Sequence, residues 1–222
     1  MHEKKIRILI HACPRRMWYV KDFLAPGLEA QGAEVEIWND SAGLGNLKAC
    51  MASFAARPEG DGGTWHIQDD VLPRRDFVER ARALDEGVVY GFCNEQFTDN
   101  PACTGRVYVP DAWHSFQCVR IPDAYARACA DWLEHDGRGH PDYCQWISTG
   151  KMDDSVFRNW LIERHGFETV VNAKPNLVEH VDWIIGGSVL HPWRGYLSRA
   201  HYWDDPALVD ELKEAVRGRV QY

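Results

Sequence analysis

The chain has 222 residues, of which 45% are apolar and 26% are charged, and its formal net charge is −8. This length suits one α/β domain, which can bury about 70% of its unfolded surface and needs no disulfide or metal to hold its core. The acidic balance argues against a generic nucleic-acid-binding protein, which would carry an excess of Lys and Arg, and leaves room only for a local basic groove.

Seven cysteines occur without any C-x-x-C pair, which argues against a zinc ribbon or a thioredoxin motif. The opening MHEKKIRILIHACP passes from a short apolar run straight into Pro and Arg, so it predicts a first strand rather than a signal peptide. No segment approaches the ~18 apolar residues that a membrane span needs. We therefore expect a cytoplasmic protein with reduced thiols and no membrane partner.

The chain begins with a strand–helix–strand pattern. Residues 6–12 form a β-branched apolar run typical of a buried strand. Residues 18–32 follow as a helix that Pro26 interrupts, and residues 33–40 alternate as a second strand ending in Asp40. This order favours a parallel sheet with a right-handed crossover.

A glycine-containing loop and a short helix fill residues 41–60. A third strand is predicted over 64–68, a helix over 74–86 and another strand over 87–94. Two acids follow the third strand directly. They lie where open α/β sheets bind ligands, just past the carboxyl ends of the strands.

The second half of the chain is less regular. Residues 94–118 are punctuated by Pro and Gly and give no clear element, and 136–150 is expected to be a loop. The remaining elements are a short strand followed by an extended segment over 167–181, and helices over 121–135, 151–166 and 206–220. There is no repeat, low-complexity tract or linker, so we expect one domain.

The two acids after the third strand, Asp69 and Asp70, need a physical explanation. Adjacent carboxylates at the end of a buried strand repel each other and are costly to desolvate. Mg²⁺ or Mn²⁺ would neutralise the pair and bridge to substrate phosphates, stabilising a diphosphate leaving group. The alternative is a helix-capping role, which is common for acid pairs.

Four motifs, taken in order, resemble the GT-A class of glycosyltransferases. They are the basic loop ACPRRMWYV, a second strand ending in Asp40, the acidic motif HIQDDV, and GKMDDSVFRNWL followed by AKPNLVEHVD. The resemblance covers residues 6–188. It implies a single Rossmann-like GT-A domain with a mixed, mostly parallel sheet flanked by helices, a nucleotide-sugar-binding half over 1–95 and an acceptor-binding half over 96–222.

The resemblance implies a metal site. Asp70 matches a metal ligand, with Asp69 beside the metal or the donor ribose, and His180 matches the late histidine that contacts metal or diphosphate. Gln68 replaces the acid of the usual DxD form, which leaves the number of metal ligands open. A histidine in this position also fits a role in the core or on the surface.

Five further residues are predicted to contact the nucleotide sugar. Arg15 or Arg16 would reach the diphosphate, since guanidinium binds such groups bidentately, although an exposed Arg is an equal alternative. Asp40 would accept from the ribose or the base, or would simply form a turn. Asn46, after the glycine loop, and Lys151, in the late motif, complete the set.

Asp153 and Asp154 are the candidate general base of an inverting transfer, in which the acceptor hydroxyl loses its proton while it attacks the sugar. The resemblance favours Asp154. The alternative is that these acids complement the dipole at a helix start. A retaining enzyme would need neither acid as a base.

Ten tryptophans are many for this length. In the irregular stretches these side chains and a histidine could stack on a sugar or a base, although core packing is the more common role. The candidates are Trp113, His114, Trp146 and Trp193.

We therefore expect a glycosyltransferase that uses Mn²⁺ or Mg²⁺ and a nucleotide-sugar donor, most simply a UDP-sugar. The acceptor stays open between a glycan, a small molecule and a hydroxymethylated DNA base, the substrate of compact phage-type members of the class. Two alternatives are a non-catalytic nucleotide-sugar-binding module and a nucleotidyltransferase. The latter usually carries a Gly-rich loop after its first strand, and HACPRRMW contains no glycine. The sequence leaves the oligomeric state open.

Overall fold

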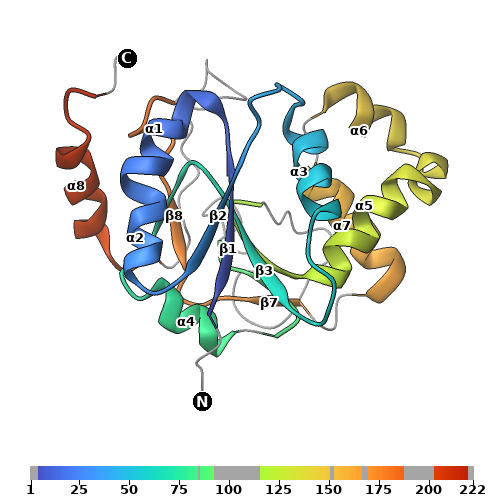
Figure 1. The fold of residues 1–222 in the computed structure, drawn as a ribbon, viewed down its shortest axis with the longest axis horizontal. Helices are drawn as coiled ribbons and strands as arrows, with labels where there is room; N and C mark the ends of the chain where they lie inside the picture. The colour runs from blue at the N-terminus through green and yellow to red at the C-terminus, as the bar shows by residue number, and fades with distance from the viewer. Residues whose placement is uncertain are drawn as a thin grey trace.

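The structure is a computed structural model that describes residues 5–84, 86–92, 116–150, 153–166, 170–187 and 203–219. A six-stranded sheet with the order β2-β1-β3-β6-β5-β7 lies at its centre (Figure 1). The strands are β2 (Glu34–Asn39), β1 (Arg7–Ala12), β3 (Gly63–Gln68), β6 (Cys118–Pro122), β5 (Val88–Tyr90) and β7 (Val170–Asn172).

Strand β1 pairs in parallel with β2 and β3, and β5 pairs in parallel with β7. Strand β6 is antiparallel to both of its neighbours, β3 and β5. All the strands except β6 therefore run in one direction, which confirms the predicted α/β fold with a mixed, mostly parallel sheet.

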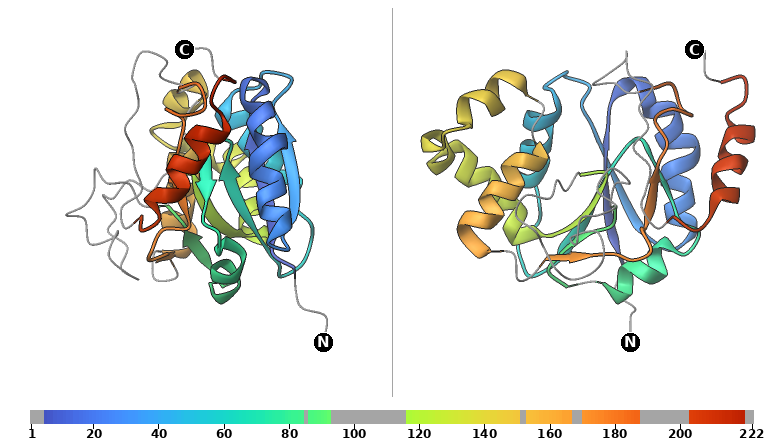
Figure 2. Two further views of the ribbon diagram at one scale, coloured as in Figure 1. Left: turned by 90° about the vertical axis from the view of Figure 1, so that its left-hand side faces the viewer. Right: turned by 180° about the vertical axis from the view of Figure 1, so that it is seen from behind.

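Helices cover both faces of this sheet, as two of the views agree (Figures 1 and 2). One face carries α1 (Met17–Tyr19), α2 (Ala25–Ala30), α4 (Phe77–Ala83) and α8 (Pro206–Ala215). The other carries α3 (Asn46–Ala55), α5 (Asp123–Glu134), α6 (Tyr143–Thr149) and α7 (Asp153–His165).

Two apolar cores result from this layering, because successive side chains of a strand point to opposite faces. Ile8 and Ile10 of β1 and Trp65 of β3 pack into the first core. Val119 of β6 and Phe157 of α7 pack into the second. The sheet thus separates two cores and presents one edge, where β1, β2 and β3 end, to the loops.

The first helical segment differs from its prediction, because Pro26 does not interrupt it. A π-helical turn, Val20–Leu24, joins α1 directly to α2. Pro26 falls at the second residue of α2, where the missing N–H costs little.

Two elements of the second half were not predicted. Strand β6 inserts between β3 and β5, just after the stretch that gave no clear element. Helix α6 lies in the predicted loop 136–150, after a 3₁₀ turn, Asp136–Gly139. Helix α6 is held by Trp146, which is 1% exposed, and ends at Gly150 with φ of +63°.

A small second sheet positions a predicted site residue. Strands β4 (Val71–Pro73) and β8 (Val178–His180) pair antiparallel, with Val71 opposite His180. Because β4 directly follows the two acids after β3, this pairing brings His180 beside them.

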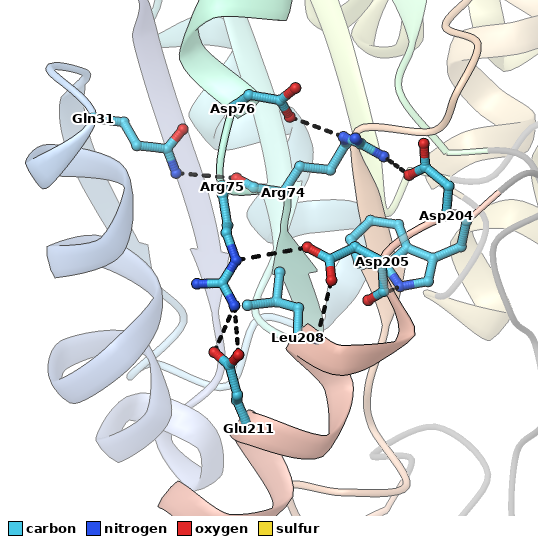
Figure 3. A network of polar contacts seen from close by, with 9 residues as sticks. Gln31, Arg74, Arg75, Asp76, Asp204, Asp205, Leu208 and Glu211 are labelled. Carbon is cyan, nitrogen blue, oxygen red and sulfur yellow. Dashed lines mark hydrogen bonds and ion pairs between the residues drawn. The ribbon is translucent and has the colours of Figure 1, made fainter.

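Arginines at the end of β4 hold helix α8 against the first core (Figure 3). Arg75 donates to both carboxylate oxygens of Glu211 at 2.6 Å. Arg74 is bonded to Asp76 at 2.9 Å and to Asp204.

A groove of about 300 Å³ lies between α2, β4 and α8, and its lining includes Phe23, Pro73 and Leu212. None of the predicted site residues that fall within the described ranges lines this groove. No helix in the described part of the chain is long and apolar enough to cross a membrane.

Candidate functional site

Asp69 and Asp70 form the turn between β3 and β4, at the edge where the parallel strands end. Asp69 is 5% exposed and Asp70 is 9% exposed, so both carboxylates are largely removed from water. The predicted location at a strand end is therefore correct, and it makes the cost of desolvation real.

Arg16 provides the positive charge that the acid pair needs. It belongs to a 3₁₀ turn, Pro14–Arg16, directly after β1. Its Nη1 donates to Oδ1 of Asp69 at 2.8 Å and to Oδ2 of Asp70 at 2.7 Å. The backbone N–H of Cys13 donates to Oδ2 of Asp69 at 2.6 Å. A buried guanidinium thus bridges two buried carboxylates, which offsets their repulsion.

His180, the last residue of β8, and the chain that follows it complete the centre from the other side. His180 Nε2 lies 3.3 Å from Oδ2 of Asp70, and His180 Nδ1 lies 3.9 Å from Oδ1 of Asp182. Nη2 of Arg16 donates to the carbonyl oxygen of Gly187 at 2.9 Å. We call Arg16, Asp69, Asp70, His180 and Asp182 the acidic centre; it is assembled from the ends of β1, β3 and β8.

Charges within the acidic centre shift the pKa values of its members. Burial opposes ionisation of Asp70, but Arg16 and His180 outweigh it and lower the pKa of Asp70. Burial and the neighbouring Asp70 raise the pKa of Asp69 against the effect of Arg16. The pKa of His180 is raised because Asp70 and Asp182 outweigh its burial. The centre therefore favours an ionised Asp70 between two cationic partners.

Two carboxylate oxygens of the acidic centre are not engaged. Oδ1 of Asp70 and Oδ1 of Asp182 are buried and have no hydrogen-bond partner among the described residues. Buried polar atoms are normally satisfied, so such an atom calls for a ligand or another explanation. Oδ1 of Asp70 belongs to the acid pair and is the atom of the acidic centre that best fits a bound cation.

The predicted metal site stays a prediction. Within the described ranges, no three or more His, Cys, Asp or Glu side chains converge to hold a metal ion. Asp70 and His180 lie together, and Mg²⁺ is usually held by one or two carboxylates while water and phosphate fill the other positions. The residues present therefore fit a metal whose coordination the substrate completes.

Arg15 and Asp40 are placed differently from Arg16. Arg15 is exposed and donates to the carbonyl of Gly186 at 2.6 Å. Asp40, after β2, accepts from the N–H groups of Leu44 at 2.7 Å and Gly45 at 3.0 Å. The turn-forming role that we weighed for Asp40 is thus observed, because its two oxygens close the loop ahead of α3.

Asn46 and Asp153 form a second polar cluster at this edge of the sheet. The Nδ2 of Asn46 donates to Oδ1 of Asp153 at 2.7 Å. Asp153 is 5% exposed, and burial together with the neighbouring Asp154 raises its pKa well above the ordinary value. Asp154 is half-buried and accepts from the N–H of Ser155 at 2.7 Å.

Four predicted contacts lie outside the described residues: Trp113, His114, Lys151 and Trp193. Trp146 packs in the second core and stacks on His140 at 4.4 Å between ring centroids. A sugar-stacking role for Trp146 is therefore excluded, and the packing role is correct.

Sequence reasoning missed Asp182 and the carbonyl groups of Gly186 and Gly187. Asp182 stands two residues after His180 and was available as a signal in the segment EHVD. The carbonyl partners had no signal, since backbone acceptors carry no side-chain identity.

A histidine pair between β1 and β3, in which His66 is buried and His11 is half-buried, was also missed. His11 Nε2 lies 3.0 Å from His66 Nδ1 on the neighbouring strand. Burial and then Arg57 lower the pKa of His11 to about 4. Burial and then His11 lower the pKa of His66. Both rings are therefore neutral near pH 7.

Comparisons with known proteins add little to the site. No protein-family model matches the sequence, and no curated protein matches it. The chain is similar to a solved structure assigned as a glucose-1-phosphate thymidylyltransferase from Bacillus anthracis, in complex with sucrose. The identity is 11%, the TM-score is 0.41, and the match covers 76% of this chain and 86% of that chain. A likeness of this size says nothing about activity.

Proposed function

We propose that the chain is a GT-A-class glycosyltransferase that binds the diphosphate of a nucleotide sugar at the acidic centre. The observation that carries this proposal is the carboxylate of Asp70 where β3 ends: its Oδ2 lies between Arg16 and His180, while its buried Oδ1 has no hydrogen-bond partner among the described residues. A strand end that carries both carboxylates for a metal and a guanidinium for phosphate oxygens suits a metal-bridged diphosphate.

In this proposal Mn²⁺ or Mg²⁺ is held by Asp70, with Asp69 and His180 beside it. The metal would neutralise the charge that develops on the diphosphate as it leaves. Arg16 would bind the diphosphate oxygens bidentately, and exposed Arg15 is one residue away to assist. The donor we expect is a UDP-sugar.

Three further residues are proposed to contact the donor. Asp40 and Asn46 flank the loop between β2 and α3, where a nucleoside would lie past the strand ends. Lys151 belongs to the late motif and is proposed for the diphosphate. Asp69 is proposed to bind the ribose of the donor.

The acceptor step is proposed to be inverting, with Asp154 as the base. The acceptor oxygen forms its bond to C1 of the sugar while the bond from C1 to the diphosphate oxygen breaks, with its electron pair going to the diphosphate. The acceptor proton passes to Asp154. Asp153 is the weaker candidate, because its raised pKa and its bond to Asn46 favour a structural role.

A glycan, a small molecule and a hydroxymethylated DNA base are all proposed acceptor classes. A DNA acceptor would require the target base to leave the stack and would make affinity for DNA fall steeply with salt. We expect the enzyme to act in the cytoplasm.

Turnover of nucleotide sugars tests this proposal. UDP-, GDP-, CMP- and dTDP-sugars are incubated with the chain and Mn²⁺, and the released nucleotide is measured. One donor should be consumed by the wild type and not by Asp70→Asn. Consumption of a nucleoside triphosphate and a sugar phosphate with release of pyrophosphate would instead support a nucleotidyltransferase. Binding of a nucleotide sugar without turnover would support the non-catalytic module.

A further inference from the structure

The bridge made by Arg16 occupies the carboxylate oxygens that a metal would use. Nη1 of Arg16 lies 2.8 Å from Asp69 Oδ1 and 2.7 Å from Asp70 Oδ2. The second oxygen of Asp69 accepts from the backbone of Cys13. The bridged oxygen of Asp70 also lies 3.3 Å from His180. Asp70 Oδ1 is the one oxygen of the acid pair without a hydrogen-bond partner among the described residues.

A divalent cation cannot share this bridge with Arg16. Mg²⁺ binds oxygen at about 2.0–2.1 Å and demands near-octahedral geometry. A guanidinium nitrogen held on the same oxygens would crowd the metal, and the two like charges would repel each other strongly at this separation in a buried site. While Arg16 holds the bridge, Oδ1 of Asp70 is the one oxygen of the acid pair left for a metal among the described contacts, so firm binding of the metal requires Arg16 to leave.

We propose that Arg16 and a divalent metal are alternative counter-ions of Asp69 and Asp70, so that the metal enters only when Arg16 leaves the bridge. This inference rests on the proposed function in taking the centre as a metal–diphosphate site. It adds that Arg16 controls when the metal binds.

The surroundings of Arg16 favour such an exchange. Its Nε is buried and has no hydrogen-bond partner in the part of the chain that the structure describes, so the bridging position leaves one donor unsatisfied there. A diphosphate offers several acceptors in the planar arrangement that guanidinium binds best. Movement of Arg16 onto the diphosphate would free both carboxylates for the metal. The divalent metal and the diphosphate should therefore bind cooperatively, each raising the affinity for the other by about 5- to 150-fold, the usual range of such coupling.

The affinity of the full chain for Mn²⁺ alone tests this inference. Electron paramagnetic resonance of the free ion measures how much Mn²⁺ is bound. The variants are Arg16→Gln and the control Arg57→Gln. Arg57 is also buried, at 6% exposure, but it pairs with the carboxylate of Glu36 and does not belong to the acidic centre. We expect Arg16→Gln to bind Mn²⁺ at least tenfold more tightly than the wild type, and Arg57→Gln to bind it as the wild type does.

Stability provides a second readout, because Arg16→Gln removes the guanidinium that bridges two buried carboxylates. Mn²⁺ should raise the melting temperature of Arg16→Gln more than that of the wild type. If Arg16→Gln is unfolded without metal, Mn²⁺ should restore its circular dichroism spectrum, and failure to restore it would contradict the inference.

Equal Mn²⁺ affinity in the wild type and Arg16→Gln would overturn the inference, as would an equal gain in Arg57→Gln. The proposed function fails separately. If the wild type binds a nucleotide sugar with Mn²⁺ while Arg16→Gln shows no gain, only the inference is lost. If no nucleotide sugar binds, the proposed function is lost even where Arg16→Gln gains a Mn²⁺ site.

Discussion

Asn46 donates a 2.7 Å hydrogen bond to Asp153 and thereby joins the first residue of α3 to the first residue of α7. Since Asp153 is buried beside another acid, its pKa is raised and its protonated form is favoured. This pair separates the roles of the two neighbouring acids: Asp153 holds two helices together, and Asp154 remains the candidate base.

Replacement of Asp153 by Asn should change stability in a pH-dependent way. A carboxyl group with a raised folded-state pKa stabilises the fold below its unfolded pKa, near 3.8, and this contribution is lost as pH rises through the folded value. Asp153→Asn lacks that loss, so its stability relative to the wild type should increase from pH 4 to pH 8. Urea unfolding at pH 4, 6 and 8 measures it. A relative stability that falls over this range would show that Asp153 is ionised in the fold.

Replacement of Asp154 by Asn should lower turnover by roughly 10²–10⁴-fold, the usual contribution of a general base. Donor affinity should not change, because the acceptor proton plays no part in binding the nucleotide sugar. Steady-state kinetics and donor titration of both variants check this. If Asp153→Asn alone lowers turnover while Asp154→Asn does not, the assignment of the base is reversed.

The histidine pair between β1 and β3 predicts a loss of stability in mild acid. The pKa of His11 is lowered to about 4 in the fold, below 6.5, so its neutral form contributes stability above pH 6.5. That contribution is lost as pH falls towards 4. At ~1.4 kcal/mol per pKa unit, His11 should account for about 2 kcal/mol between pH 7 and pH 5.

His11→Gln should remove much of this dependence, which denaturant unfolding at pH 7 and pH 5 would measure. His135→Gln is the control, since the side chain of His135 is 71% exposed. An equal loss of stability between pH 7 and pH 5 in the wild type and in His11→Gln would contradict the lowered pKa of His11.

The two arginines that hold α8 should differ in their effect on stability. Arg75 pairs with Glu211, and both side chains are 58% exposed, so Arg75→Gln should change the stability very little. Arg74 is 8% exposed and its guanidinium lies 5.8 Å from the ring centroid of Trp203. Arg74→Gln should cost about 1–3 kcal/mol, because it removes the hydrogen bonds of a largely buried guanidinium to the carboxylates of Asp76 and Asp204. Thermal unfolding compares the two, and the reverse order would contradict this account of α8.

The sequence was sufficient for elements whose signal is local. The apolar run of β1, the alternation of β2 and the acids after β3 depend on neighbouring residues alone. Strand β6 could not be identified in this way, because its partners lie about 30 to 60 residues earlier in the chain. Helix α6 is seven residues long and depends on burial of Trp146, which no periodicity reveals.

The residues of the candidate site were likewise predictable only where their signal is local. Asp69, Asp70 and His180 were identified from their motifs, and the structure brings them together. The bridging position of Arg16 was not predicted, because it depends on how the turn after β1 points across a sheet edge to residues more than 50 positions away. A sequence motif names the charged residues but not the partner that each one binds.

The most direct test of the central claim, a metal–diphosphate site at the acidic centre, is a thermal-shift screen of UDP-, GDP-, CMP- and dTDP-sugars with and without Mn²⁺. A ligand that binds only the folded state stabilises it by RT ln(1 + [L]/Kd). We predict a Mn²⁺-dependent rise in melting temperature with one nucleotide sugar, and no such rise in Asp70→Asn. A wild-type chain that no nucleotide sugar stabilises, with or without Mn²⁺, would contradict the claim and leave the acid pair and Arg16 as a structural ion cluster.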